Sequence, residues 1–143
     1  MSEISTTISA PRRGWPVRLM SVVAVAFGLL TLKEGGAVLL GNEAARAAAG
    51  QIVPFVLWFN FMAGFAYVAA GVGLWLGKCW ATRLAMVIAL ANVAVLAALG
   101  VHIALGLGWE QRTLVAMLLR TVIWLVIAAL AWRHEKRGQR AAS

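Results

Sequence analysis

Four long apolar runs, separated by short polar segments, dominate this sequence. The runs cover residues 15–35, 52–77, 84–107 and 113–132. Each is long enough to cross a bilayer as a helix, which takes about 20 apolar residues. Lipid offers no partner for unpaired backbone groups, so such segments must be helical. The pattern predicts an all-α integral membrane four-helix bundle with short loops and one longer connector, between the first and second spans.

Charged side chains are too few for a water-soluble fold of this size. Only 13% of the 143 residues are charged and 62% are hydrophobic, whereas soluble domains have about 25% charged and 45–50% apolar residues. The net charge of +8 does not indicate nucleic acid, because the basic residues gather at the ends of the apolar runs and in the tails. We therefore expect the lipid bilayer as a partner and no nucleic acid.

The segments outside the spans form tails and connectors around one membrane domain, residues 15–132. Residues 1–14 are a polar tail and residues 133–143 a basic one, whereas the alanine-rich segment 41–51 predicts a short surface helix. The end of the first span stays open, because Lys33, Glu34 and two glycines interrupt it. Glu34 lies at the outer surface if the helix stops at Gly35, and inside the membrane if the helix reaches Leu40.

The basic residues also predict an orientation, because cytoplasmic loops are enriched in Lys and Arg. One side holds nine of them and the other holds three, with Arg120 left out because it lies inside a span. Tryptophans near the span ends agree with two interfacial belts. The sequence thus predicts a multi-pass protein of a bacterial inner membrane with both termini in the cytoplasm. The nine are Arg12, Arg13, Arg18, Lys78, Arg83, Arg133, Lys136, Arg137 and Arg140, and the three are Lys33, Arg46 and Arg112.

Polar and small residues recur in the spans at helical spacing, which puts each set on one helix face. Because polar atoms are costly in lipid, we expect these faces to line the protein interior. The sets are Ser21, Gly28, Thr31 and Glu34; Asn60, Gly64, Tyr67 and Gly71; Asn92, Leu99 and His102; and Thr113, Met117, Arg120 and Trp124. For helix packing we single out Gly64, Tyr67, Gly71, Gly73, Gly77 and Asn92.

Depth along the spans predicts a polar cluster in the outer half of the protein. Glu34, Asn60, His102, Glu110 and Arg120 all lie near or within about two turns of the outer surface, and we expect them to converge as a binding or translocation cluster. An arginine within a span costs about 2.5–3.5 kcal/mol on insertion scales. Three interpretations of Arg120 remain open: a functional site, a buried ion pair with Glu34 or Glu110, or a side chain that snorkels outward.

Metal and redox chemistry have little support in the sequence. The single cysteine, Cys79, forms neither an intrachain disulfide nor a CxxC pair. Copper would suit His102 together with Met62 or Met117, but no metal-ligand spacing supports such a site. A haem held by two histidines fails, because His134 belongs to the tail. We expect no metal and no cofactor.

The function expected first is a non-enzymatic one, as an accessory or structural subunit of the membrane. The chain contains no aspartate and no nucleophile–base pair. The alternative is a small transporter or channel for an ion or polar solute, which would use the outer-half cluster around Arg120. The sequence leaves open whether the chain forms a homo-oligomer or joins another membrane protein.

Overall fold

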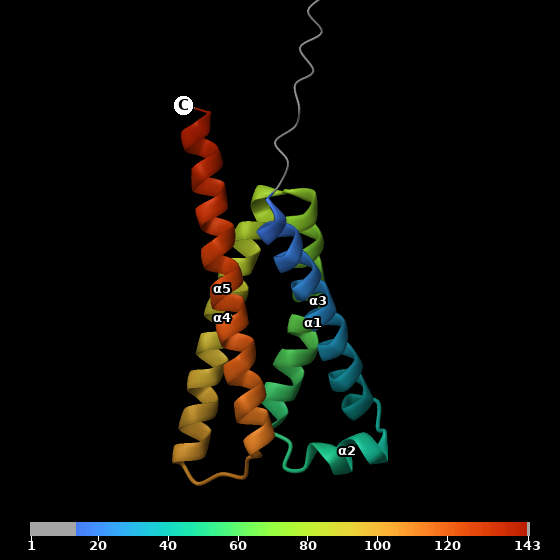
Figure 1. The fold of residues 1–143 in the computed structure, drawn as a ribbon. Coiled ribbons are helices and arrows are strands. Elements are labelled where there is room, and N and C mark those ends of the chain that lie inside the picture. Colours follow the sequence, from blue (N-terminus) through green and yellow to red (C-terminus); the bar gives the residue numbers. More distant parts are fainter. Residues whose placement is uncertain (1–13, 143) are drawn as a thin grey trace, which may run out of the picture.

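The computed structural model describes residues 14–142, and these residues form five helices (Figure 1). The helices are α1 (Trp15–Leu39), α2 (Glu43–Ala49), α3 (Pro54–Leu76), α4 (Cys79–Ala104) and α5 (Gln111–Ala141). All but the short α2 are long and apolar enough to cross a membrane, as predicted. The expected polar tail lies outside the described residues except for Gly14, and so do Arg12 and Arg13.

Helix α1 takes the longer of the two courses that the sequence allows. It continues through Lys33 and Glu34 to Leu39, because Gly35 and Gly36 are buried beside the ring of Phe61 on α3. Contact with a neighbouring helix thus outweighs the low helix propensity of two consecutive glycines. Glu34 therefore lies inside the helix, one turn before its end.

The connections are set by proline, glycine and one capping residue. Pro54 occupies the first turn of α3, where its missing N–H costs nothing. Gly77 ends α3 with φ of 72°, and α4 begins directly afterwards at Cys79. The turn expected over residues 78–83 is therefore largely helix. Asn42 caps α2 by accepting a hydrogen bond from the Ala45 N–H at 3.2 Å.

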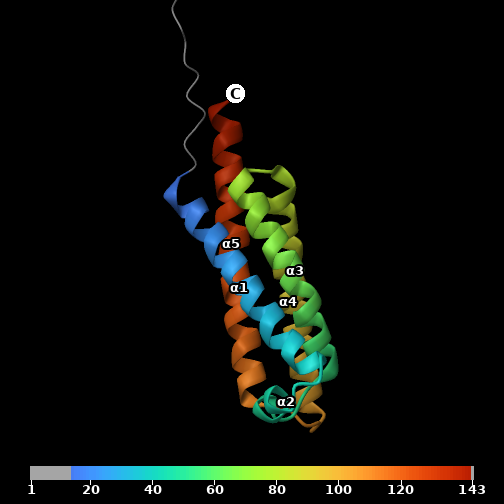
Figure 2. The same ribbon diagram turned by 90° about the vertical axis from the view of Figure 1, so that its right-hand side faces the viewer.

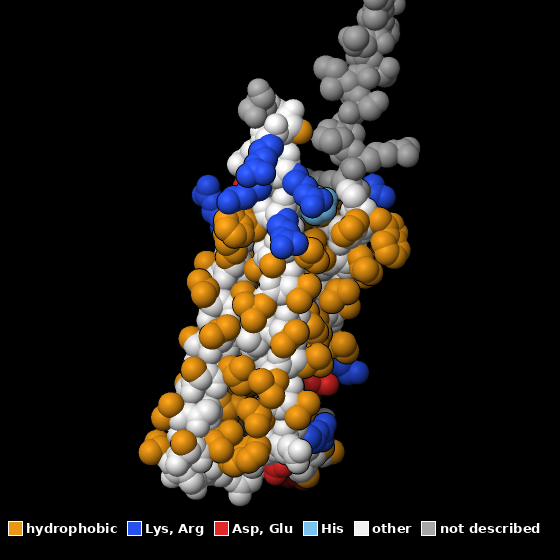
Figure 3. Space-filling model, turned by 60° about the vertical axis from the view of Figure 1, so that its left-hand side comes forward, with side chains coloured by type: hydrophobic (Ala, Val, Ile, Leu, Met, Phe, Trp, Pro, Cys, Tyr) orange, Lys and Arg blue, Asp and Glu red, His pale blue; other side chains and the backbone are white. Residues whose placement is uncertain are grey.

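Helix α5 runs to Ala141 and includes most of the basic segment 133–143. This extension projects beyond the other helices at the end of the molecule where α1 begins (Figures 1 and 2). Helix α2 lies across the opposite end, which we call the α2 end. On the face that Figure 3 shows, apolar side chains cover the surface between these ends, whereas Lys and Arg gather mainly where α5 projects.

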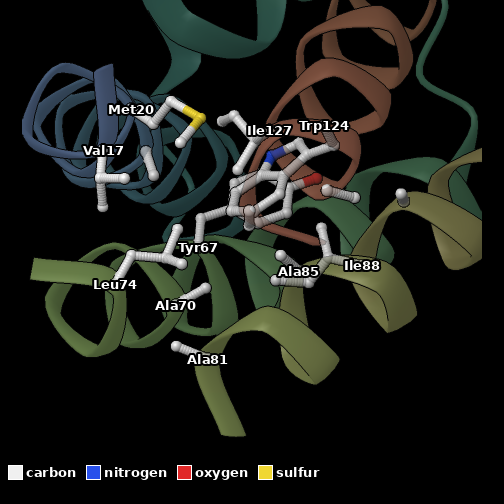
Figure 4. Packing of buried hydrophobic residues seen from close by; sticks show 14 residues of the cluster. Val17, Met20, Tyr67, Ala70, Leu74, Ala81, Ala85, Ile88, Trp124 and Ile127 are labelled. Atoms are coloured by element: carbon white, nitrogen blue, oxygen red, sulfur yellow. The ribbon is translucent and has the colours of Figure 1, made fainter. Parts of the chain in front are cut away.

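The helices pack mainly in pairs. Helix α1 lies along α3, α4 lies along α5, and α3 contacts α4, whereas α1 and α5 touch each other only briefly. The fully buried rings of Tyr67 and Trp124 lie with their centroids 4.7 Å apart in the main core cluster (Figure 4). The Tyr67 hydroxyl donates to Asn92 Oδ1 at 3.0 Å and so joins α3 to α4.

Glycines make the close approach of α1 and α3 possible. A Cβ on Gly28 would lie 2.9 Å from the carbonyl oxygen of Gly64, and one on Gly71 would lie 2.9 Å from that of Ser21. Gly73 has the same role against Ala81 and Trp80 of α4. Five of the six residues singled out for packing thus lie at helix contacts, while Gly77 forms the turn after α3. Small residues at such contacts are typical of membrane helices.

Gly28→Ala and Gly71→Ala should each lower the free energy of unfolding by about 1–3 kcal/mol, the usual cost of overpacking. The obstacle is backbone of the facing helix, which cannot rotate away. Gly100→Ala on α4 is the matched control, because its Cβ would meet nothing within 4 Å. Unfolding in mixed dodecylmaltoside–SDS micelles measures all three. Equal stability of the three variants would contradict the close α1–α3 contact.

Candidate binding site

A cavity of about 420 Å³ lies between α1, α3 and α5 and is covered by α2. Its apolar lining consists mainly of small residues, including Ala45, Ala48 and Ala49 of α2 and Ala116 of α5. Small side chains leave the space open. Its polar lining consists of Thr31, Lys33, Glu34, Asn60, Arg112, Thr113 and Arg120.

Arg120 is the most deeply buried charge of this lining, with only 7% of its surface exposed. Its Nη2 donates to Thr31 Oγ1 at 3.3 Å, and its Nη1 lies 3.8 Å from the sulfur of Met117. The guanidinium carbon lies 5.5 Å from the ring centroid of Phe27 and 6.0 Å from that of Tyr67. Cation–π contacts of this length attract the charge without neutralising it.

No acidic side chain within residues 14–142 comes within ion-pair distance of Arg120, although Glu34 lines the same cavity. The Nε of Arg120 is buried without a hydrogen-bond partner among the described residues. An outward snorkelling course is not seen either, because the side chain contacts Thr31, Phe27 and Tyr67 inside the protein. Of the three interpretations, the ion pair and the snorkelling side chain are absent from this structure.

Asn60 contributes a second unpaired group to the cavity. Its Oδ1 is buried and has no hydrogen-bond partner from the described residues. A buried amide oxygen without a partner costs about 1–3 kcal/mol. Among residues 14–142, Arg120 Nε is thus an unused donor and Asn60 Oδ1 an unused acceptor, and both belong to residues that line the cavity.

Two further arginines hold α2 over the cavity. Arg112 of α5 donates to the Ala48 carbonyl oxygen at 3.0 Å, and Arg46 donates through Nε to the Val38 carbonyl oxygen at 3.0 Å. These bonds link α2 to α5 and to α1. Helix α2 thus places Ala45, Ala48 and Ala49 along the cavity.

The structure brings together three of the five residues predicted to form the cluster. Glu34, Asn60 and Arg120 line the cavity, whereas His102 and Glu110 do not. His102 Nε2 lies 3.1 Å from the Gly108 carbonyl oxygen, and Glu110 Oε1 accepts a hydrogen bond from the Gln51 N–H at 3.2 Å. Both residues hold the connections at the α2 end instead.

Several residues of the cavity were not part of the predicted cluster. Thr31 shares a helix face with Glu34, and this spacing was the available signal for its role. Arg112 and Lys33 had been counted only as interfacial charges. Residues 14–142 contain no group of three His, Cys, Asp or Glu side chains placed to hold a metal ion.

Comparisons of the chain with protein-family models, with curated proteins and with solved structures find no match. The site is therefore interpreted from its own geometry.

Proposed function

We propose that the protein spans a bacterial inner membrane as a four-helix bundle with both termini in the cytoplasm. The four apolar helices support the membrane location, and the gathering of Lys and Arg where α5 projects supports the orientation (Figure 3). In this arrangement α2 lies on the outer surface and the cavity lies in the outer half of the membrane.

Cys79 offers a direct test of this orientation, because it is exposed at the start of α4 and is the only cysteine. A membrane-impermeant maleimide should label it in inside-out vesicles and leave it unlabelled in right-side-out vesicles. The control is Cys79→Ser combined with Ala47→Cys on α2, which should reverse the pattern. The opposite result for both proteins would show that the termini are outside.

Within this topology, we propose a non-enzymatic role: the cavity binds a small polar solute or ion that the protein transports or conducts. The observation that carries this proposal is Arg120, a buried charge without an acidic partner that lines the cavity. Ionisable residues within membrane spans that face the protein interior often mark substrate or ion pathways. Asn60 and Glu34 supply further polar contacts in the same space.

Arg120→Ala should abolish solute flux into proteoliposomes while the protein still folds and inserts. The matched control is Arg83→Ala, because Arg83 is an exposed arginine at the opposite end of the molecule. Flux is measured with a panel of labelled anions, cations and uncharged polar solutes. Flux that survives in Arg120→Ala, or that is lost equally in both variants, would contradict the proposal.

A role as an accessory subunit is the second candidate. It is favoured by a shallow apolar groove of about 370 Å³ between α1 and α3, which Val25, Gly71 and Trp75 help to form. A partner helix would fit such a groove through close packing beside Gly71. Val22→Phe, at an exposed position of the groove, should then disrupt a complex seen by cross-linking in membranes, and leave solute flux unchanged.

A further inference from the structure

The charge of the cavity lining is positive overall. Lys33, Arg112 and Arg120 contribute three cationic side chains, whereas Glu34 is the one acid of that lining. Arg112 also donates to the backbone of α2. A site with this balance attracts anions from the surrounding solution.

Arg120 has the geometry that an oxyanion requires. The guanidinium is planar, and its fork of N–H groups matches the paired oxygens of phosphate or carboxylate. Thr31 and the rings of Phe27 and Tyr67 hold this fork in place, while Nε remains without a partner. An anion in the cavity would neutralise the buried charge.

Asn60, which lines the same cavity, carries the complementary group, because its Oδ1 is an acceptor without a donor among residues 14–142. A protonated oxygen, as in monohydrogen phosphate or a phosphate ester with a hydroxyl group, donates to such an acceptor while its charged oxygens accept from Arg120. A simple halide offers no such donor. The pair of unused groups therefore favours an oxyanion that carries a hydroxyl.

The positions of α1 and α5 bear on the source of the ligand, because both helices line the cavity. These helices touch only briefly and separate toward α2 (Figure 1). In the proposed topology, the cavity that they line lies beside the bilayer as well as near the outer solution. A phosphate group can therefore arrive free in solution or as the head group of a lipid.

We propose that the cavity binds a phosphate oxyanion, with Arg120 as its main ligand and Asn60 as acceptor for its hydroxyl. This inference rests on the proposed function, because it names the class of solute. Binding should be one to one, and the affinity should fall by about 30-fold or more in Arg120→Gln. Arg120→Lys keeps the charge without the fork of N–H groups, so its affinity should lie between those of wild type and Arg120→Gln.

The test titrates purified protein with inorganic phosphate, with phosphatidylglycerol and with phosphatidylcholine, and follows binding by calorimetry and native mass spectrometry. Arg83→Gln is the control for lost charge. Ala116→Phe fills the cavity from an exposed position of its lining and leaves Arg120 in place, so it serves even if Arg120→Gln fails to fold. Its control for added bulk is Ala94→Phe on α4, which lies outside the cavity lining.

Phosphate binding that Arg120→Gln and Ala116→Phe both weaken supports a soluble oxyanion. The same pattern for phosphatidylglycerol alone supports a lipid head group. The inference is overturned if neither inorganic phosphate nor phosphatidylglycerol binds, or if wild type and Ala116→Phe bind them equally. If a cation or an uncharged solute then binds and Ala116→Phe blocks it, the proposed function survives without the oxyanion. If no class of solute binds in this way, both fail.

Discussion

Trp124→Ala should lower the free energy of unfolding by about 3 kcal/mol, the lower end of the range for large aromatic residues in protein cores. The side chain is fully buried and lies against Tyr67, with their centroids 4.7 Å apart. Its Nε1 has no hydrogen-bond partner within residues 14–142, so the substitution leaves no polar group there without its partner. The whole loss comes from packing, which in a bilayer replaces the hydrophobic effect as the main force between helices.

The measurement is unfolding in mixed dodecylmaltoside–SDS micelles, with Trp58→Ala as the matched control. Trp58 belongs to α3 but is 56% exposed, so its loss should change stability by less than about 1 kcal/mol. A loss no larger for Trp124 than for Trp58 would mean that the Tyr67–Trp124 contact contributes little to the fold.

The spans and their helical state could be predicted from hydropathy, because length and apolar composition decide whether a segment crosses a bilayer. Helix ends were harder to predict. Gly35 and Gly36 read as an interruption, yet α1 continues because they lie beside Phe61, a contact between segments distant in the sequence. The charged segment after Trp132 lacks hydropathy, yet its Arg, Lys, Glu and Gln residues are good helix formers and extend α5.

The depth of the candidate site along the helices could be predicted from the sequence, but the direction in which some of its side chains point could not. Helical spacing placed Asn60 and Arg120 at similar depth on interior faces, and both line the cavity. His102 has a suitable depth too, but its ring turns to the Gly108 carbonyl oxygen in the α4–α5 connection. Glu110 turns to the backbone of Gln51. The course of a connection depends on local turns such as Gly106, with φ of 73°, and apolar periodicity carries no information about it.

Arg120→Met should make the protein more stable in the absence of anions, by about 1 kcal/mol. An unneutralised arginine within a span costs about 2.5–3.5 kcal/mol. Against this, the Thr31 hydrogen bond contributes about 0.6 kcal/mol, and each cation–π contact with Phe27 and Tyr67 about 0.5–1 kcal/mol. The cost of the charge exceeds the sum, so a methionine of similar length should pack in its place with a net gain.

Saturating phosphate should reverse this order of stability and make wild type more stable than Arg120→Met. A ligand at 100 times its Kd stabilises the folded state by about 2.7 kcal/mol, and Arg120→Met should bind phosphate at least about 30-fold more weakly than wild type, so it should gain less. Unfolding of wild type and Arg120→Met, each with and without phosphate, measures the reversal, and Arg83→Met controls for general effects of charge. A methionine variant that is less stable by more than about 1 kcal/mol without anions would mean that Arg120 stabilises the fold. A binding residue at this position lowers the stability of the protein without ligand, whereas a packing residue raises it. The sign of the stability change in Arg120→Met without phosphate therefore distinguishes the two roles.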